Sequence, residues 1–143
     1  MNVAFFLTPK VNTVYLYDDS TIRQGLEKLY HHGFTAIPVI TRDGQYVGTV
    51  SEGDFLWYLV ERSEDKIGKV NLRSVEDKPI RSVLKEDRNP PVDITVTLDT
   101  LFKRATQQNF IPVIDDAGSF IGIVTRRSIL QAVSKQHTAP QTV

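Results

Sequence analysis

The sequence of 143 residues contains no cysteine, and it has only one methionine and one tryptophan. The absence of cysteine excludes disulfide bonds and zinc sites built on thiolates, and it is compatible with a reducing compartment. Basic and acidic residues number 17 each, so the formal net charge is zero. This balance removes the usual electrostatic argument for a protein dedicated to nucleic-acid binding.

Long apolar runs are also missing. The stretch Phe55–Val60 is far shorter than the ~20 residues that span a bilayer. The apolar start Met1–Leu7 lacks the basic leader of a signal peptide. Hydrophobic residues make up 41% of the chain and charged residues 24%, values typical of globular domains. We therefore expect a soluble, cytoplasmic protein that contacts neither a membrane nor nucleic acid.

What the sequence does contain is an internal repeat. A shift of 74 residues places Ile37–Ile40 on Ile111–Ile114, and both segments read Ile-Pro-Val-Ile. Over residues 34–56 this shift gives eight identities without a gap, where composition alone would give about one or two. A unit of ~60 residues is marginally stable alone, so we expect the two copies to pack sheet to sheet around a shared core.

Each copy predicts the order strand, helix, strand, strand, helix, which is an α/β (α+β) fold. In the first copy Ser20 is expected to cap a helix that Gly33 ends. Asp43 and Gly44 predict the turn of a hairpin between 36–40 and 46–50. The first repeat also predicts a first strand near Val14–Tyr17 and a helix from Glu52 with Phe55, Leu56, Leu59 and Val60 on one face. The second repeat predicts a first strand near Ile94–Val96, a shorter helix with Leu98, Leu101, Phe102 and Ala105 aligned, and two strands around the turn Asp115–Gly118. Its last helix carries Ile129, Leu130 and Val133.

These elements suggest a division of the chain. We expect repeat 1 over residues 1–61, a charged linker over 62–77, repeat 2 over 78–136 and a tail over 137–143. The opening segments of the two repeats also correspond loosely, with Phe6 and Leu7 near Val83 and Leu84.

The repeated pattern resembles a known family. The segments Thr35–Val39, Gly48–Asp54 and Gly122–Arg127 are similar to those of a pair of CBS domains, also called a Bateman module. The resemblance covers nearly the whole chain. It implies a regulatory module, not an enzyme, that binds AMP, ADP, ATP or cyclic di-AMP in clefts between the repeats, needs no other cofactor, forms a homodimer and signals to a protein partner. The sequence Thr125-Arg126-Arg127 also resembles stand-alone CBS pairs of Gram-positive bacteria that bind cyclic di-AMP.

Ser51 and Asp54 admit two compatible interpretations. Their spacing at a helix start is that of a capping box, in which hydroxyl and carboxylate each satisfy a backbone amide. The amides of a helix N-terminus also bind phosphate. The resemblance implies that Ser51 contacts phosphate and that Asp54 accepts hydrogen bonds from ribose hydroxyls.

The second repeat departs from this pattern. Thr125 keeps the capping hydroxyl, whereas Ser128 replaces the aspartate, which puts a matching ribose contact in doubt. Arg126 and Arg127 oppose the positive end of the helix dipole. They either reach solvent or acidic partners, or they hold a bound anion, since the arginine fork suits phosphate oxygens.

Adenine recognition is expected beside the proline-containing strands. Proline removes a donor from the sheet ladder, so it should lie at an edge or an end, where a flat base can approach. Phe110 is placed to stack on a base in the second repeat. The expected contacts are Lys10, Thr13, Thr35, Ala36, Ile37 and Pro38 in the first repeat, and Phe110, Ile111 and Pro112 in the second, although a plain buried strand explains Ile37 equally well.

Other functions find less support. His31 and His32 adjoin at a helix end without the spaced ligands of a metal site, so we expect no metal. A hydrolase that uses Asp54 and His31 lacks a complete set of nucleophile, base and orienting group. The alternative we retain is a ligand-free dimeric scaffold whose working surface is the helix at 55–60.

Overall fold

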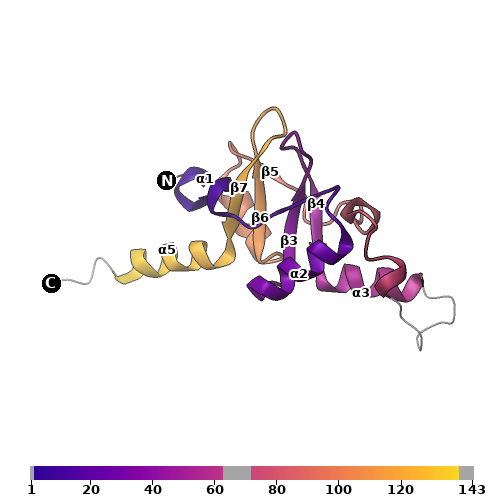
Figure 1. Ribbon diagram of the computed structural model, residues 1–143. Coiled ribbons are helices and arrows are strands. Elements are labelled where there is room, and N and C mark those ends of the chain that lie inside the picture. Colours follow the sequence, from indigo (N-terminus) through magenta and orange to yellow (C-terminus); the bar gives the residue numbers. More distant parts are fainter. Residues whose placement is uncertain (1, 63–71, 139–143) are drawn as a thin grey trace. The chain divides into compact units, whose positions relative to one another are not determined.

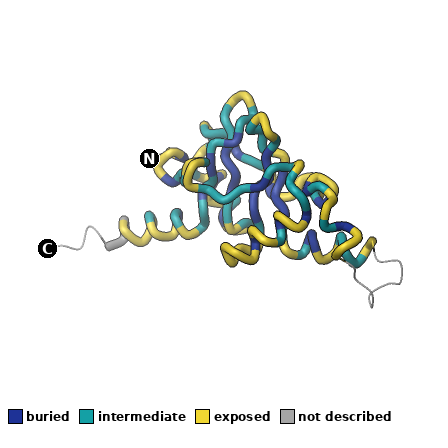
Figure 2. The backbone as a smooth tube through the Cα atoms, in the orientation of Figure 1, coloured by how far each residue is buried: buried dark blue, intermediate teal, exposed yellow. Residues whose placement is uncertain are grey.

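The computed structural model describes residues 2–62 and 72–138, and these form two compact units (Figure 1). One unit is Val14–Arg88, and the other combines Met1–Thr13 with Asn89–Val143. In both units the buried residues follow the strands, and the helices are exposed on their outer faces (Figure 2). Within the described part of the chain, no helix is long and apolar enough to cross a membrane.

The unit Val14–Arg88 contains a three-stranded sheet and two longer helices. Its strands lie in the order β2-β3-β4, with β2 parallel to β3 and β3 antiparallel to β4. The hairpin predicted around Asp43 and Gly44 is therefore confirmed. The elements are β2 (Leu16–Tyr17), α2 (Ile22–His32), β3 (Ala36–Ile40), β4 (Tyr46–Ser51) and α3 (Glu52–Glu61).

The ends of α2 show why its capping residue was misplaced by one position. Thr21, not Ser20, is the N-cap, and it forms a capping box with Gln24. Ser20 instead belongs to a turn, because its backbone N–H donates to the carbonyl of Tyr17. Gly33 ends the helix as predicted, with a left-handed φ of 67° that favours glycine.

The second unit repeats this arrangement and adds one strand. Its sheet has the order β1-β7-β6-β5, with β1 and β6 antiparallel to β7 and β5 parallel to β6. The helix α4 is shorter than α2, as predicted. The elements are α1 (Val3–Phe6), β1 (Leu7–Pro9), β5 (Val92–Asp93), α4 (Leu98–Ala105), β6 (Phe110–Ile114), β7 (Phe120–Thr125) and α5 (Arg126–Thr138).

The first strand of the second repeat lies earlier than predicted. We expected it near Ile94–Val96, but the ladder comprises Val92 and Asp93. The cause is a turn at its end, where the Asp93 carboxylate accepts from the backbone and hydroxyl of Thr95. The backbone N–H of Val96 also donates to the Asp93 carbonyl, so the chain cannot continue as a strand.

The two strand prolines occupy central strands, so of the two positions that we expected, an edge or an end, the edge is wrong. Pro38 is in β3, between β2 and β4, and Pro112 is in β6, between β5 and β7. Both are tolerated because the short parallel strand pairs only with the two residues that follow each proline. Each proline therefore lies just beyond the end of a parallel ladder.

Each unit has a core of its own, and each core is completed by a segment from beyond the repeat. The packing of the two copies around a shared core stays a prediction. In the first unit Val75, Ile80 and Val83 join the residues of β3, β4, α2 and α3. In the second unit Val3 and Phe6 join the residues of β6, β7, α4 and α5. The leading segments Phe6–Leu7 and Val83–Leu84 therefore do correspond, because each packs on the core formed by the strands and helices of the other repeat.

The expected division of the chain differs from these compact units. The segment Met1–Thr13, which we assigned to repeat 1, lies in the unit that holds the second repeat. Within the expected linker 62–77, residues 63–71 lie outside the described part, but Val75 is buried beside the 3₁₀-helix η3 (Leu72–Ser74). Of the expected tail 137–143, α5 extends to Thr138 and the rest lies outside the described residues.

Several residues predicted on apolar helix faces are exposed. In α3 Phe55 is buried and Leu59 packs on the core, but Leu56 is 52% exposed. In α5 Ile129 is buried, whereas Leu130 is 61% exposed. The outer positions of these helices therefore form apolar surface and not core.

One glycine lies where the N-terminal strand β1 joins the sheet of the second unit. Gly122 of β7 pairs with Pro9 of β1, and its φ of 152° lies outside the range favoured by other residues. A Cβ atom at this position would overlap the carbonyl oxygen of Thr8. Gly48, the matching residue of the first repeat, has a similar φ of 158°, but a Cβ atom there would meet only the side chain of Leu84, at 3.3 Å.

We predict that Gly122→Ala destabilises the protein more than Gly48→Ala. The first substitution pushes a methyl group against backbone and should cost roughly 3 kcal/mol of unfolding free energy. The second meets a side chain that can move and should cost about half as much. Urea denaturation followed by circular dichroism measures both, and equal losses would contradict the close approach of β1 to Gly122.

Candidate functional site

The helix start at Ser51 is fixed by a complete capping box. Ser51 Oγ accepts a hydrogen bond from the backbone N–H of Asp54 at 3.2 Å. The backbone N–H of Ser51 donates in return to Asp54 Oδ2 at 2.9 Å. The next amide, that of Glu52, donates to the carbonyl of Thr35 at 2.9 Å. The capping interpretation is thus confirmed, and it ties the start of α3 to the residue before β3.

The Asp54 carboxylate also pairs with a cation that sequence reasoning missed. Arg88 Nη2 lies 3.2 Å from Asp54 Oδ1, and Arg88 Nη1 donates to Ser51 Oγ at 3.4 Å. The Asp54 side chain is 1% exposed and that of Arg88 is 39% exposed. A buried carboxylate needs such partners, because desolvation of an unpaired charge is costly.

The second repeat keeps the cap but not the carboxylate. The backbone N–H of Ser128 donates to Thr125 Oγ1 at 3.0 Å, so Thr125 caps α5 as Ser51 caps α3. Ser128 Oγ donates to the carbonyl of Thr125 at 2.8 Å and lies 3.5 Å from the carbonyl of Phe6. A single hydroxyl therefore replaces the two carboxylate oxygens of Asp54.

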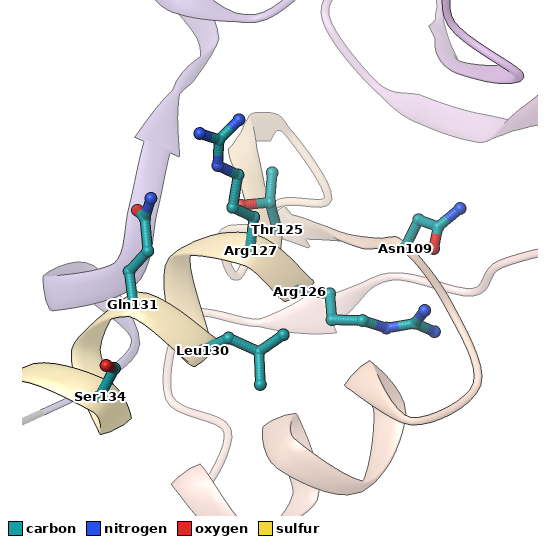
Figure 3. Close-up of a pocket in the computed structure, with 7 residues that line it drawn as sticks. All are labelled: Asn109, Thr125, Arg126, Arg127, Leu130, Gln131 and Ser134. Carbon is teal, nitrogen blue, oxygen red and sulfur yellow. The ribbon is translucent and has the colours of Figure 1, made fainter. Parts of the chain in front are cut away.

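The two arginines of the second repeat have different surroundings. Arg126 Nε donates to the carbonyl of Ala105 at 2.6 Å, which places its charge at the C-terminal end of α4. Arg127 is exposed. Figure 3 shows the two guanidinium groups pointing in different directions, with Arg127 on the side of Thr125. Arg126 thus has a structural role besides any role in binding an anion.

An open hollow of about 540 Å³ lies along the start of α5 (Figure 3). Its polar end is formed by the capping threonine and the arginines, and its other end by exposed residues of the helix. The lining residues are Asn109, Thr125, Arg126, Arg127, Leu130, Gln131 and Ser134.

The strand residues expected to contact adenine differ in their exposure. Ile37 and Ile111 have no exposed surface, and Pro38 and Pro112 are also buried. The side chains of the two isoleucines belong to the cores, so only their backbone remains for a ligand. In this respect the plain-strand explanation of Ile37 is adequate.

The first residues of these strands are more accessible and lie beside the capping residues. Ala36 pairs with Ser51, and Phe110 pairs with Thr125 in the same register. Thr35 is exposed, whereas Ala36 and Phe110 are half-buried. Each unit therefore brings a strand start and a capped helix start together.

Lys10 and Thr13 belong to the unit of the second repeat. Lys10 opens the 3₁₀-helix η1 (Lys10–Asn12), which contacts β7. The hydroxyl of Thr13 donates to the carbonyl of Pro9 at 2.9 Å. The structure thus groups these two residues with β7.

The residues that were missed carry no local signal. Arg88 lies 37 residues from Ser51 in sequence, and no spacing rule connects them. Asn89 is also buried, and its side-chain amide donates to the carbonyl of Phe110 at 3.2 Å, 21 residues away in sequence.

The two helix starts differ in charge. The first turn of α3 carries Glu52 and Asp54, and Arg88 faces the second of these. The first turn of α5 carries Arg126 and Arg127 and no acid. Two capped helix starts of opposite charge are therefore available for anionic or hydroxyl-bearing groups.

An apolar groove of about 600 Å³ lies between α2 and α3. Tyr30 is 91% exposed there, and Phe34 and Leu56 are also exposed. His31 and His32 lie nearby at the end of α2, with their rings in edge-to-face contact. Within the described part of the chain no three potential metal ligands gather.

Comparison with known proteins supports a family assignment. CBSX1, a chloroplastic CBS domain-containing protein of Arabidopsis thaliana, is 26% identical over 154 residues, which cover 91% of this chain and 63% of that protein. The crystal structure of CbpB in complex with c-di-AMP has a TM-score of 0.86 and 26% identity, covering 97% of this chain and 88% of CbpB. CBSX2 of Arabidopsis thaliana in complex with AMP has a TM-score of 0.75 and 25% identity, covering 95% and 98% of the two chains.

The chain thus spans less than two thirds of the length of CBSX1. The family model of the CBS domain matches twice, over residues 7–61 and 80–135. These two matches contain both capped helix starts, and together they cover most of the sequence. The chain belongs to the CBS-domain family and carries two CBS repeats.

Proposed function

We propose that this protein is a regulatory module that binds an adenine nucleotide, either AMP, ADP or ATP, or cyclic di-AMP. The observation that carries the proposal is the pair of hydroxyl-capped helix starts, Ser51 and Thr125, each opposite the first residue of a strand. Backbone amides at such helix starts bind phosphate. The relatives crystallised with c-di-AMP and with AMP support the same ligand class.

The residues divide the work of recognition. Asp54 accepts from ribose hydroxyls, because a carboxylate can accept two hydrogen bonds at once. Ser51 and Thr125 contact phosphate, and Arg127 adds a cation beside Thr125. Adenine lies against the strand starts at Thr35–Pro38 and Phe110–Pro112, with Lys10 and Thr13 contributing from η1. Ligand binding changes the shape or order of the module, and a protein partner responds to this change. The module itself catalyses no reaction.

The protein also forms a homodimer in this proposal. The exposed apolar residues of the groove between α2 and α3 support it, because monomers rarely expose a contiguous apolar surface of this kind. A ligand-free scaffold would use the helix at 55–60, which lines the same groove. The two functions differ in whether nucleotide changes the stability or the assembly of the dimer.

We expect AMP, ADP, ATP or cyclic di-AMP to raise the melting temperature of the protein. A ligand at one hundred times its Kd stabilises the folded state by about 2.7 kcal/mol. Differential scanning fluorimetry with the four nucleotides, followed by calorimetry, measures the effect, and GMP serves as the control. If all four leave the melting temperature unchanged, the ligand-free scaffold is the better description.

We expect Asp54→Asn to weaken AMP at least tenfold, which corresponds to about 1.4 kcal/mol. The same substitution should hardly change the affinity for 2′,3′-dideoxy-AMP, because that ligand has no hydroxyls to donate. Asp43→Asn, which changes charge equally in an exposed turn, is the matched control. Similar losses for both ligands would contradict the ribose contact.

We expect Leu56→Glu to shift the protein from dimer to monomer, because it places a charge in the apolar groove. Val11→Glu introduces the same charge at an exposed apolar residue that does not line the groove, and should leave the dimer intact. Sedimentation velocity with and without AMP measures both variants. A dimer that tolerates Leu56→Glu would show that the dimer interface does not include this groove.

A further inference from the structure

The guanidinium of Arg88 contacts both of the side-chain atoms that the proposed function assigns to ligand. It lies 3.2 Å from Asp54 Oδ1 and donates to Ser51 Oγ at 3.4 Å. Asp54 Oδ2 is engaged separately, by the backbone N–H of Ser51. A ribose hydroxyl that approaches Asp54 Oδ1 must therefore share this oxygen with Arg88 or replace it.

When a ligand displaces Arg88 from Asp54 Oδ1, the electrostatic cost depends on the charge of the ligand. A neutral ribose returns hydrogen bonds to Asp54, but it offers no anion to the displaced guanidinium. A phosphate beside the ribose does offer one, and its oxygens match the arginine fork. The first turn of α3 also carries Glu52 and Asp54, which repel phosphate unless a cation such as Arg88 offsets them.

The unit that contains α5 indicates that the ion pair is not needed to hold the helix start. Leu16 pairs with Val39 as Val92 pairs with Val113, so Arg88 corresponds in position to Asn12. Asp54 corresponds to Ser128. Both members of the ion pair are therefore replaced in the unit that holds Asn12 and Ser128, yet its helix α5 is capped by Thr125 all the same.

The backbone around Arg88 is held in an unusual conformation. Asp87 and Asn89, on either side of it, have positive φ values of 59° and 53°. Such residues cost free energy and persist only where the surroundings impose them. Burial of Asn89 and the contact of Arg88 with Asp54 are two such constraints.

We propose that Arg88 is a specificity-determining residue of the Ser51–Asp54 site, which it restricts to ligands that carry a phosphate beside the ribose. The inference rests on the proposed function, since it concerns the same site. Arg88 pairs with Asp54 in the empty site and turns to the phosphate when a nucleotide binds. A nucleoside leaves the guanidinium without an anion and is bound weakly.

Calorimetry with AMP, cyclic di-AMP and adenosine on wild type and Arg88→Gln tests this assignment. Wild type should bind a nucleotide at least tenfold more tightly than adenosine. In Arg88→Gln this ratio should fall towards one, because the nucleotide loses a cation and adenosine gains access to Asp54. Arg81→Gln, at an exposed arginine of the same unit, changes the charge equally and should keep the wild-type ratio.

Arg88→Lys provides a second variant in case Arg88→Gln fails to fold, as judged by circular dichroism. Lysine keeps the charge but not the fork, so the ratio should fall about threefold. A folded variant, Gln or Lys, with the wild-type ratio overturns the assignment of Arg88 and leaves the proposed function standing. If wild type binds neither nucleotide, both the proposed function and the role of Arg88 are wrong.

Discussion

The antiparallel pairing of β1 with β7 at Gly122 determines how the second unit is completed. Because this residue has no Cβ, the backbone at Thr8 can approach β7 and pair with it. The segment that arrives this way also brings Val3 and Phe6 into the core, where burial of each side chain contributes about 1.5–3 kcal/mol. Without the pairing of β1 with β7, β7 would be an open edge strand.

The same constraint acts in the first unit in a weaker form. Gly48 faces the side chain of Leu84, and the chain leading to it buries Ile80 and Val83. These segments also carry residues that we propose for ligand binding. One continues to Arg88, beside Asp54, and the other to Lys10 and Thr13, beside β7. The leading segment of each repeat, which packs in the unit of the other repeat, therefore contributes both to the core and to the proposed binding site of that unit.

This dependence explains which features could be predicted from sequence. The hairpin at Asp43, the helix end at Gly33 and the box between Ser51 and Asp54 each involve residues within a few positions of one another. Their spacing is enough to identify them. The packing of each leading segment on the other repeat, and the contact of Arg88 with Asp54, join positions that are far apart in the sequence. Neither follows from local spacing or from the alignment of the two repeats.

The errors have equally local causes. Ser20 and Thr21 both have hydroxyls suited to a cap, and a turn bond from Ser20 to Tyr17 decides between them. Prolines in central strands contradict a rule for full ladders, and the rule fails here because β2 and β5 have two residues each. Such choices depend on the lengths of partner strands, which spacing along one segment does not reveal.

The capping and binding interpretations of Asp54 can both hold because its two oxygens have separate partners. Oδ2 accepts from the backbone of Ser51 and maintains the helix start, whereas Oδ1 faces Arg88. A ligand that changes the surroundings of Oδ1 therefore leaves the cap in place. Ser128 has one oxygen, and its hydroxyl already donates to the carbonyl of Thr125. The duplicated scaffold thus keeps two caps but only one carboxylate, so the ribose contact that we propose is confined to the first helix start. In the same proposal the second helix start, with Arg126 and Arg127, offers a contact for phosphate.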